Sequence, residues 1–190
     1  ASASITSGDT ITGGTGTSDQ LTITATAGNS LTTGDLTNVT AIETFKIAND
    51  VAHSIVTNAL NVASGATLAV DATAMTSTVF TFSGIKETTT PGHFSITTGG
   101  SAAHQITLGS GNDTYTSTNT AGANDVVATG GTNTITTGAG GDTVTLGTGT
   151  DNVTLAAGND GVTATNAALA STDTIAGGSG TDTITMSDAS

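Results

Sequence analysis

The sequence predicts an all-β protein, a parallel β-solenoid whose C-terminal half is a roll of short, regular coils. Three observations predict this fold. A nine-residue pattern recurs through the C-terminal half, and short alternating strands bounded by Gly, Asn, Asp or Ser fill the rest. Hydrophobic residues make up only 35% of the 190 residues and Gly accounts for 26 of them, which suits a thin interior better than a thick globular core. A disordered Thr/Gly linker is the alternative, but it would not need apolar residues in register.

The clearest copy of the nine-residue pattern is the last one, Gly177–Thr185, which reads GGSGTDTIT. It has the form Gly-Gly-x-Gly-x-Asp-x-U-x, where U is a large apolar residue. Eight copies lie between Leu108 and Thr185. Their sixth-position residues are Asp113, Asp125, Asn133, Asp142, Asp151, Asp160, Asp173 and Asp182. The apolar residues two places later are Tyr115, Val127, Ile135, Val144, Val153, Val162, Ile175 and Ile184.

The chemistry of the pattern predicts its shape. Glycine permits positive φ and close backbone approach, so the first six residues can form a tight loop. The remaining three form a short strand that buries one side chain. Loop and strand make half a coil, so two repeats close one coil, and successive coils pair as parallel strands ~4.8 Å apart. Eight repeats therefore predict about four coils.

Alternate loops of such a roll fall on the same edge. One edge is expected to carry Asp113, Asn133, Asp151 and Asp173, and the other Asp125, Asp142, Asp160 and Asp182. Stacked carboxylates repel one another unless a cation lies between them. Carboxylate and carbonyl oxygens, without nitrogen or sulfur, favour Ca²⁺, and several calcium ions are expected. The loop glycines expected to contribute to the metal sites are Gly140, Gly149, Gly158, Gly178 and Gly180. The alternative is a run of turns in which each Asp bonds only its own backbone.

Residues 1–107 are predicted to form an irregular parallel solenoid continuous with the roll at 108–190. The expected strands are 21–26, 43–48, 54–57, 67–70, 79–82, 94–97 and 105–108. An antiparallel sandwich is the alternative for this half. A loop of the same glycine-rich style precedes Asp19, and Asp9 lies in a degenerate copy, so both are candidate calcium ligands. Simple turns are the alternative for both. Pro91 is expected in a turn.

Charge and composition exclude several functions. The net charge is −13 with two basic residues, Lys46 and Lys86, so neither nucleic acid nor anionic lipid has a basic surface to bind. No apolar run is long enough to insert into a membrane, and no basic segment followed by an apolar one marks a secretion signal. The chain begins at Ala1, which suits a mature product or an excised piece. There is no cysteine, so bound calcium is a candidate source of stability outside the cell.

No catalytic motif stands out, and the protein is not expected to be an enzyme. The three histidines show no metal-ligand spacing, and no G-x-S-x-G occurs. Glu43 with Lys46, and Glu87 with Lys86, are expected to be surface ion pairs.

The repeats resemble those of RTX proteins, the exported calcium-binding proteins of Gram-negative bacteria. The opening GDTITGGTGTSDQL, followed by NVTAIETFKI at 38–47, is similar to surface-layer proteins of that group. The resemblance implies calcium ions between loops on one edge. The implied pairs are Asp142 with Asp160, Asn133 with Asp151, Asp151 with Asp173, and Asp160 with Asp182. The chain departs from the family pattern at Asn133, at the insertion 164–170 and where the first Gly of a repeat is missing.

The resemblance implies a structural subunit of a calcium-dependent extracellular layer or filament at the cell surface, exported by type I secretion. The expected partners are copies of the chain itself and a cell-surface polysaccharide bound through a part outside this sequence. Unpaired strand edges at the ends of an open solenoid favour association. The alternative is a calcium-binding export and folding module of a larger secreted enzyme or adhesin. The sequence leaves open whether an assembly would be a sheet or a fibre.

Overall fold

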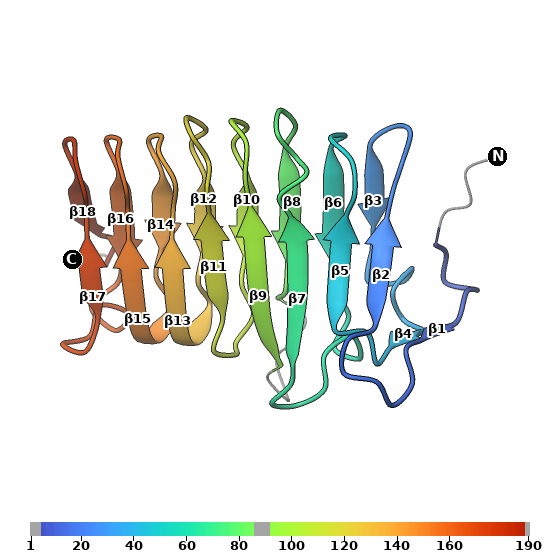
Figure 1. Cartoon of the computed structure of the whole chain (residues 1–190). Coiled ribbons are helices and arrows are strands. Elements are labelled where there is room, and N and C mark those ends of the chain that lie inside the picture. Colours follow the sequence, from blue (N-terminus) through green and yellow to red (C-terminus); the bar gives the residue numbers. More distant parts are fainter. Residues whose placement is uncertain (1–4, 86–91, 189–190) are drawn as a thin grey trace.

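The computed structural model describes residues 5–85 and 92–188, and two parallel eight-stranded sheets face each other along the whole length (Figure 1). The first sheet contains β2 (Gln20–Ile23), β5 (Thr44–Ile47), β7 (Thr67–Ala72), β9 (His93–Thr98), β11 (Thr114–Ser117), β13 (Gly130–Thr136), β15 (Thr148–Thr154) and β17 (Thr174–Ala176). The second contains β3 (Asn29–Leu31), β6 (His53–Val56), β8 (Phe80–Ser83), β10 (Gln105–Thr107), β12 (Asp125–Val127), β14 (Thr143–Thr145), β16 (Gly161–Ala164) and β18 (Thr183–Met186). The chain alternates between the two sheets, so each coil gives one strand to each.

The predicted β-solenoid is confirmed, because every strand pairing in the described residues is parallel. This excludes the antiparallel sandwich for the N-terminal half. Both sheets run without a break across the boundary expected at 107/108. The described residues form no helix, and so contain none that is long and apolar enough to cross a membrane.

All seven strands predicted in the N-terminal half are present within one to three residues of their expected bounds. Three short strands were not predicted. They are β3 and two strands that pair with each other, β1 (Ile11–Thr12) and β4 (Val39–Thr40). Strands of two or three residues show too little alternation to be recognised. The expected turn at Pro91 lies outside the described residues.

The core is two ladders of apolar side chains, one on the inner face of each sheet. The first ladder is Leu21, Phe45, Val70, Ile96, Tyr115, Ile135, Val153 and Ile175. The second is Leu31, Ile55, Phe82, Ile106, Val126, Val144 and Val162, and it ends at Ile184, which is exposed. Burying such a side chain stabilises the fold by about 1.5–3 kcal/mol. Tyr115 is fully buried, and its hydroxyl lies 3.0 Å from Thr98 Oγ1, so its polar atom is satisfied inside the core.

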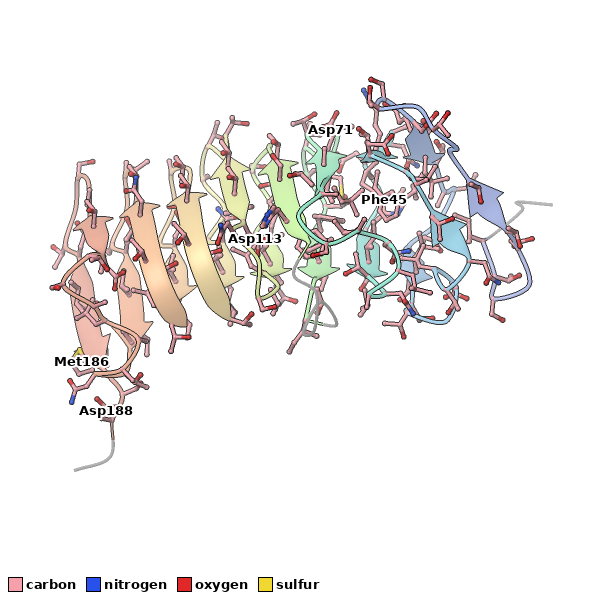
Figure 2. The ribbon with its side chains drawn as sticks, turned by 90° about the horizontal axis from the view of Figure 1, so that it is seen from below. Phe45, Asp71, Asp113, Met186 and Asp188 are labelled. Atoms are coloured by element: carbon pink, nitrogen blue, oxygen red, sulfur yellow. The ribbon has the colours of Figure 1, made fainter. Side chains whose placement is uncertain are left out.

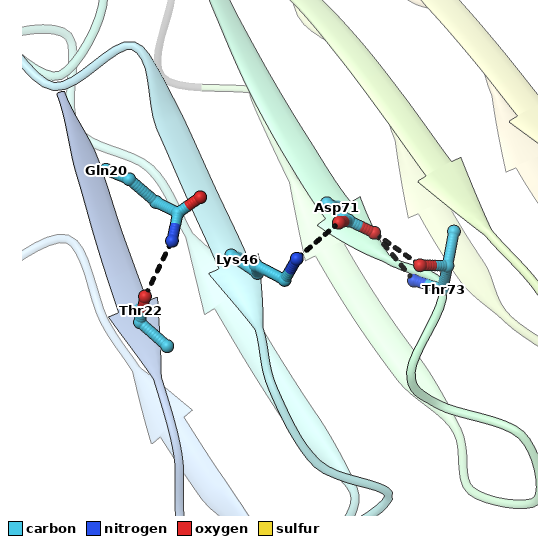
Figure 3. A network of polar contacts seen from close by, with 5 residues as sticks. All are labelled: Gln20, Thr22, Lys46, Asp71 and Thr73. Atoms are coloured by element: carbon cyan, nitrogen blue, oxygen red, sulfur yellow. Dashed lines mark hydrogen bonds and ion pairs between the residues drawn. The ribbon is translucent and has the colours of Figure 1, made fainter. Parts of the chain in front are cut away.

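The outer faces of the sheets are polar, and a surface ion pair joins two neighbouring coils (Figure 3). Lys46 Nζ lies 3.5 Å from the carboxylate of Asp71, which also accepts a hydrogen bond of 2.6 Å from Thr73 Oγ1. The pairing predicted between Lys46 and Glu43 is therefore wrong, because Glu43 turns instead toward the N–H of Asp19. The pairing expected between Lys86 and Glu87 lies outside the described residues.

Candidate metal centre

The anchor residues of the repeats form two columns, one at the start of the strands in each sheet. The first column is Asp113, Asn133, Asp151 and Asp173. The second is Asn124, Asp142, Asp160 and Asp182. Each member lies two residues before a ladder residue. Since strand side chains alternate between faces, it points to the same inner side. The predicted grouping into two edges is confirmed for seven of the eight anchors.

The register predicted at Asp125 is wrong by one residue. Asp125 is exposed in β12 and lies opposite Thr143, whereas Asn124 is buried and aligns with Asp142. The inward apolar residue of that strand is accordingly Val126 and not Val127. The dipeptide Asn-Asp offered two possible anchors, and preference for the carboxylate selected the wrong one.

One oxygen of each anchor carboxylate is used to connect coils. Asp151 Oδ1 accepts the N–H of Asn133 at 3.3 Å, and Asp160 Oδ1 accepts that of Asp142 at 2.7 Å. Asp173 and Asp182 accept the next two N–H groups at 2.8 and 3.1 Å. Each anchor thereby satisfies a backbone donor of the preceding coil that the strand pairing leaves free.

In four of the anchors the second oxygen has no partner, whereas that of Asp173 accepts the N–H of Ala170 at 2.7 Å. The Oδ2 atoms of Asp113, Asp142, Asp151 and Asp160 are buried without a hydrogen bond, and each of these side chains is about 1% exposed. Burial raises the pKa of Asp113 to about 6. Burial, and to a smaller extent the charge of the next carboxylate in the column, also raises the pKa of Asp142 and of Asp151. Buried charges of this kind are retained in proteins when they are paired or bind a metal.

Asn124 and Asn133 each form an amide–carboxylate pair with the next anchor in their column, whereas in three other pairs of neighbouring anchors both members are carboxylates. Asn133 Nδ2 donates to Asp151 Oδ1 at 2.8 Å, and Asn124 Nδ2 donates to Asp142 Oδ1 at 3.0 Å. Because Asn133 Oδ1 already accepts the N–H of Asp113, its amide presents a donor where an aspartate presents an oxygen. The expected site between Asn133 and Asp151 therefore has one anchor oxygen fewer.

Three pairs remain in which two carboxylates stack directly. They are Asp142 with Asp160, Asp160 with Asp182, and Asp151 with Asp173. No three acidic or histidine side chains gather at one point in the described part of the chain. Each of these places therefore offers the oxygens of two carboxylates. Oxygen is the ligand atom that calcium prefers.

The loop glycines let successive turns stack closely. Gly140, Gly149, Gly178 and Gly180 have φ between 86° and 142°, and Gly158 has φ of 156°. A Cβ on Gly149 would lie 1.8 Å from the carbonyl oxygen of Gly131 in the preceding coil. Only glycine fits there.

The two N-terminal candidates differ. Asp19 Oδ2 is buried and unpartnered, its N–H donates to Glu43 Oε2 at 2.9 Å, and the glycine-rich loop at 13–16 packs against its carboxylate. Asp9 is exposed and closes a local turn by accepting the N–H of Thr6 at 2.8 Å, so it lies outside the columns.

Several residues of the centre were missed by sequence reasoning. Asn124 and Glu43 are amide and carboxylate acceptors in the column positions, and His104 accepts the N–H of Phe80 through Nδ1 at 3.2 Å. Thr137 Oγ1, at the start of the Asp142 loop, is also buried and unpartnered. The nine-residue pattern extended to residues 124 and 137 could have indicated two of them.

Comparisons with protein-family models, with curated proteins and with solved structures gave no match.

The raised pKa of Asp113 predicts how the metal-free protein responds to pH. Its folded pKa of about 6 exceeds the ordinary value of 3.8, so the folded state holds the proton more tightly than the unfolded state does. Metal-free stability should therefore fall as pH rises from about 4 to about 6, by at most about 3 kcal/mol for this group. Urea denaturation at pH 4.5 and 7 measures the difference. The variant Asp113→Asn should show a smaller change, and metal-free stability that increases with pH would contradict the assignment.

Proposed function

We propose that this protein is a structural subunit of a calcium-dependent extracellular assembly, a surface layer or a filament built from copies of the chain. One observation carries the proposal: aspartate oxygens are buried, unpartnered and stacked in columns at successive coils. Such columns repel in the absence of a cation, so calcium would complete the fold. The RTX-like and surface-layer-like motifs support export by type I secretion and a location at the cell surface.

The C-terminal end of the stack supports self-association. Ile184 and Met186 are 56% and 44% exposed, whereas Val162 and Ala164, which occupy the same positions one coil earlier, are each 1% exposed. A pocket of about 220 Å³ opens there between Leu155, Val162, Ile175 and Ile184. Figure 2 shows Met186 at this end, next to Asp188. Among the described strands, β17 and β18 each have one neighbour, so their outer edges can still pair.

Electron microscopy of the purified chain tests the proposal. In millimolar calcium we expect ordered arrays or filaments, and in EGTA we expect them to disappear. The variant Ile184→Lys should abolish assembly, because it places a charge on the open end. Ile85→Lys is the matched control, since Ile85 is 49% exposed and lies away from that end. Arrays that persist in EGTA would contradict calcium control.

The alternative function is a calcium-binding export and folding module of a larger secreted enzyme or adhesin. The same columns support it, because a module of that kind also needs calcium to fold. Folded particles that remain solitary in calcium would favour this alternative over the structural subunit.

A further inference from the structure

The composition of both columns changes along the chain. Traced toward the N-terminus, the first column continues from Asp113 through Phe94 and Leu68 to Glu43. The second continues from Asn124 through His104 and Phe80 to His53. The middle coils therefore carry phenylalanine, leucine or histidine at the positions where the C-terminal coils carry carboxylates. No cation is needed to separate them.

The same middle coils have the larger apolar interior. Phe80, Phe82 and Phe94 are at most 1% exposed, and their ring centroids lie 6.3 and 5.1 Å apart in successive pairs. In the C-terminal coils four of the eight ladder residues are valine and none is phenylalanine. Valine side chains bury less apolar area than phenylalanine rings. Phe45 lies among the N-terminal coils in Figure 2.

Hydrogen bonds from polar side chains also connect neighbouring N-terminal coils, and they need no metal. Asn61 Nδ2 donates to the carbonyls of Leu36 and Val39, both at 2.8 Å, across coils. The carboxylate of Asp50 accepts the hydroxyls of Thr76, Ser77 and Thr78 at 2.6–2.7 Å. Hydrogen bonds from three hydroxyl groups and the backbone lower the pKa of Asp50 strongly, so it stays ionised.

At the junction the apolar coils meet the acidic ones through neutral or single-charge contacts. Asp113 Oδ1 accepts the N–H of Phe94 at 2.8 Å, and Asn124 Oδ1 accepts the N–H of His104 at 3.2 Å. The first acidic coil is thus joined to the apolar coils through one carboxylate and one amide. Directly stacked carboxylates begin only beyond it, at Asp142 and Asp151.

We infer that strands β5–β10 form a calcium-independent scaffold, and that the C-terminal coils add to it in order, from Asp113 toward Asp182, as calcium binds. The inference rests on the proposed calcium sites. It locates the calcium switch in β11–β18 and makes β5–β10 the template on which that part folds. The acidic pair Asp19 and Glu43 lies at the opposite, N-terminal end of this template.

Hydrogen exchange with mass spectrometry on the full chain tests it. In calcium both halves should be protected. After calcium removal, β5–β9 should stay protected while amides of β13–β18 exchange at least ~100-fold faster. Loss of protection in both halves together would overturn the scaffold. Unchanged protection everywhere would instead overturn the proposed calcium sites, and with them the inference.

Two variants test the direction of assembly at subsaturating calcium. Asp113→Ala removes the acceptor at the junction and should increase exchange throughout β11–β18. Asp182→Ala alters only the last coil and should increase exchange in β16–β18 alone. If the two variants increased exchange in the same set of strands, ordered addition would be overturned, whatever the total calcium bound.

Discussion

Replacing Asp160 by Asn is expected to remove two calcium sites while leaving the backbone contacts in place. Asp160 belongs to two of the three directly stacked carboxylate pairs, with Asp142 and with Asp182. The amide oxygen of Asn can still accept the N–H of Asp142, as Asn133 does for Asp113. Its nitrogen would then face the next carboxylate as a donor, and calcium would lose an anionic ligand at both places.

The same substitution should have opposite effects on stability with and without calcium. In calcium the variant should be less stable, because two bound ions no longer favour the folded state. Without calcium it should be more stable, by about 1–3 kcal/mol, because a buried unpaired charge is gone. Calorimetric titration gives the stoichiometry and urea denaturation gives the stability.

The control for Asp160→Asn is Asp125→Asn. Asp125 lies in a repeat of the same pattern but is exposed and one residue outside the column. Its variant should bind the same number of calcium ions as the original protein. A loss of calcium at Asp125 equal to that at Asp160 would contradict the register of the second column.

The variant Gly149→Ala is expected to destabilise the C-terminal coils by at least about 3 kcal/mol in calcium. Gly149 has φ of 142°, and an added Cβ would meet the carbonyl oxygen of Gly131 at 1.8 Å. The contact would be between the new Cβ and a backbone atom, so no side chain can move to remove the clash and the two coils must separate.

Gly161→Ala is the matched control for this glycine. A Cβ there would first meet Thr183 Oγ1 at 3.8 Å, an ordinary contact, and its stability should change by less than about 1 kcal/mol. Thermal denaturation in calcium compares the two variants. A similar loss of stability in both variants would show that the close approach of the coils at Gly149 is not what makes alanine unfavourable there.

The regular repeats made the C-terminal half predictable. Fixed spacing from Asn133 to Asp160 specifies both edge and register, and the parallel pairing of Asn133 with Asp151 follows from it. At Asp125 the predicted anchor breaks the nine-residue step, whereas Asn124 lies nine residues before Asn133. Preference for a carboxylate overrode that spacing, and the burial of Val126 agrees with the register that the spacing indicates.

The N-terminal half was predictable in its strands but not in its contacts. Alternation located β5 and β9, whereas the role of Glu43 depends on which residue of the preceding coil lies opposite it. That register comes from coils of unequal length, which no local pattern records. The column positions of Phe94 and His104 remained hidden for the same reason.

The last two coils show that the length of a coil can vary without disturbing its strands. Anchors are 18 residues apart from Asp142 to Asp160 but 22 apart from Asp160 to Asp182. The extra residues lie between Ala164 and Asp173, in a turn closed by the bond from Leu169 N–H to Thr165 O at 2.9 Å. Strand pairing on both sides is unchanged. The turn between Ala164 and Asp173 is therefore a suitable insertion site, where a foreign peptide could be displayed at one defined position along the solenoid axis.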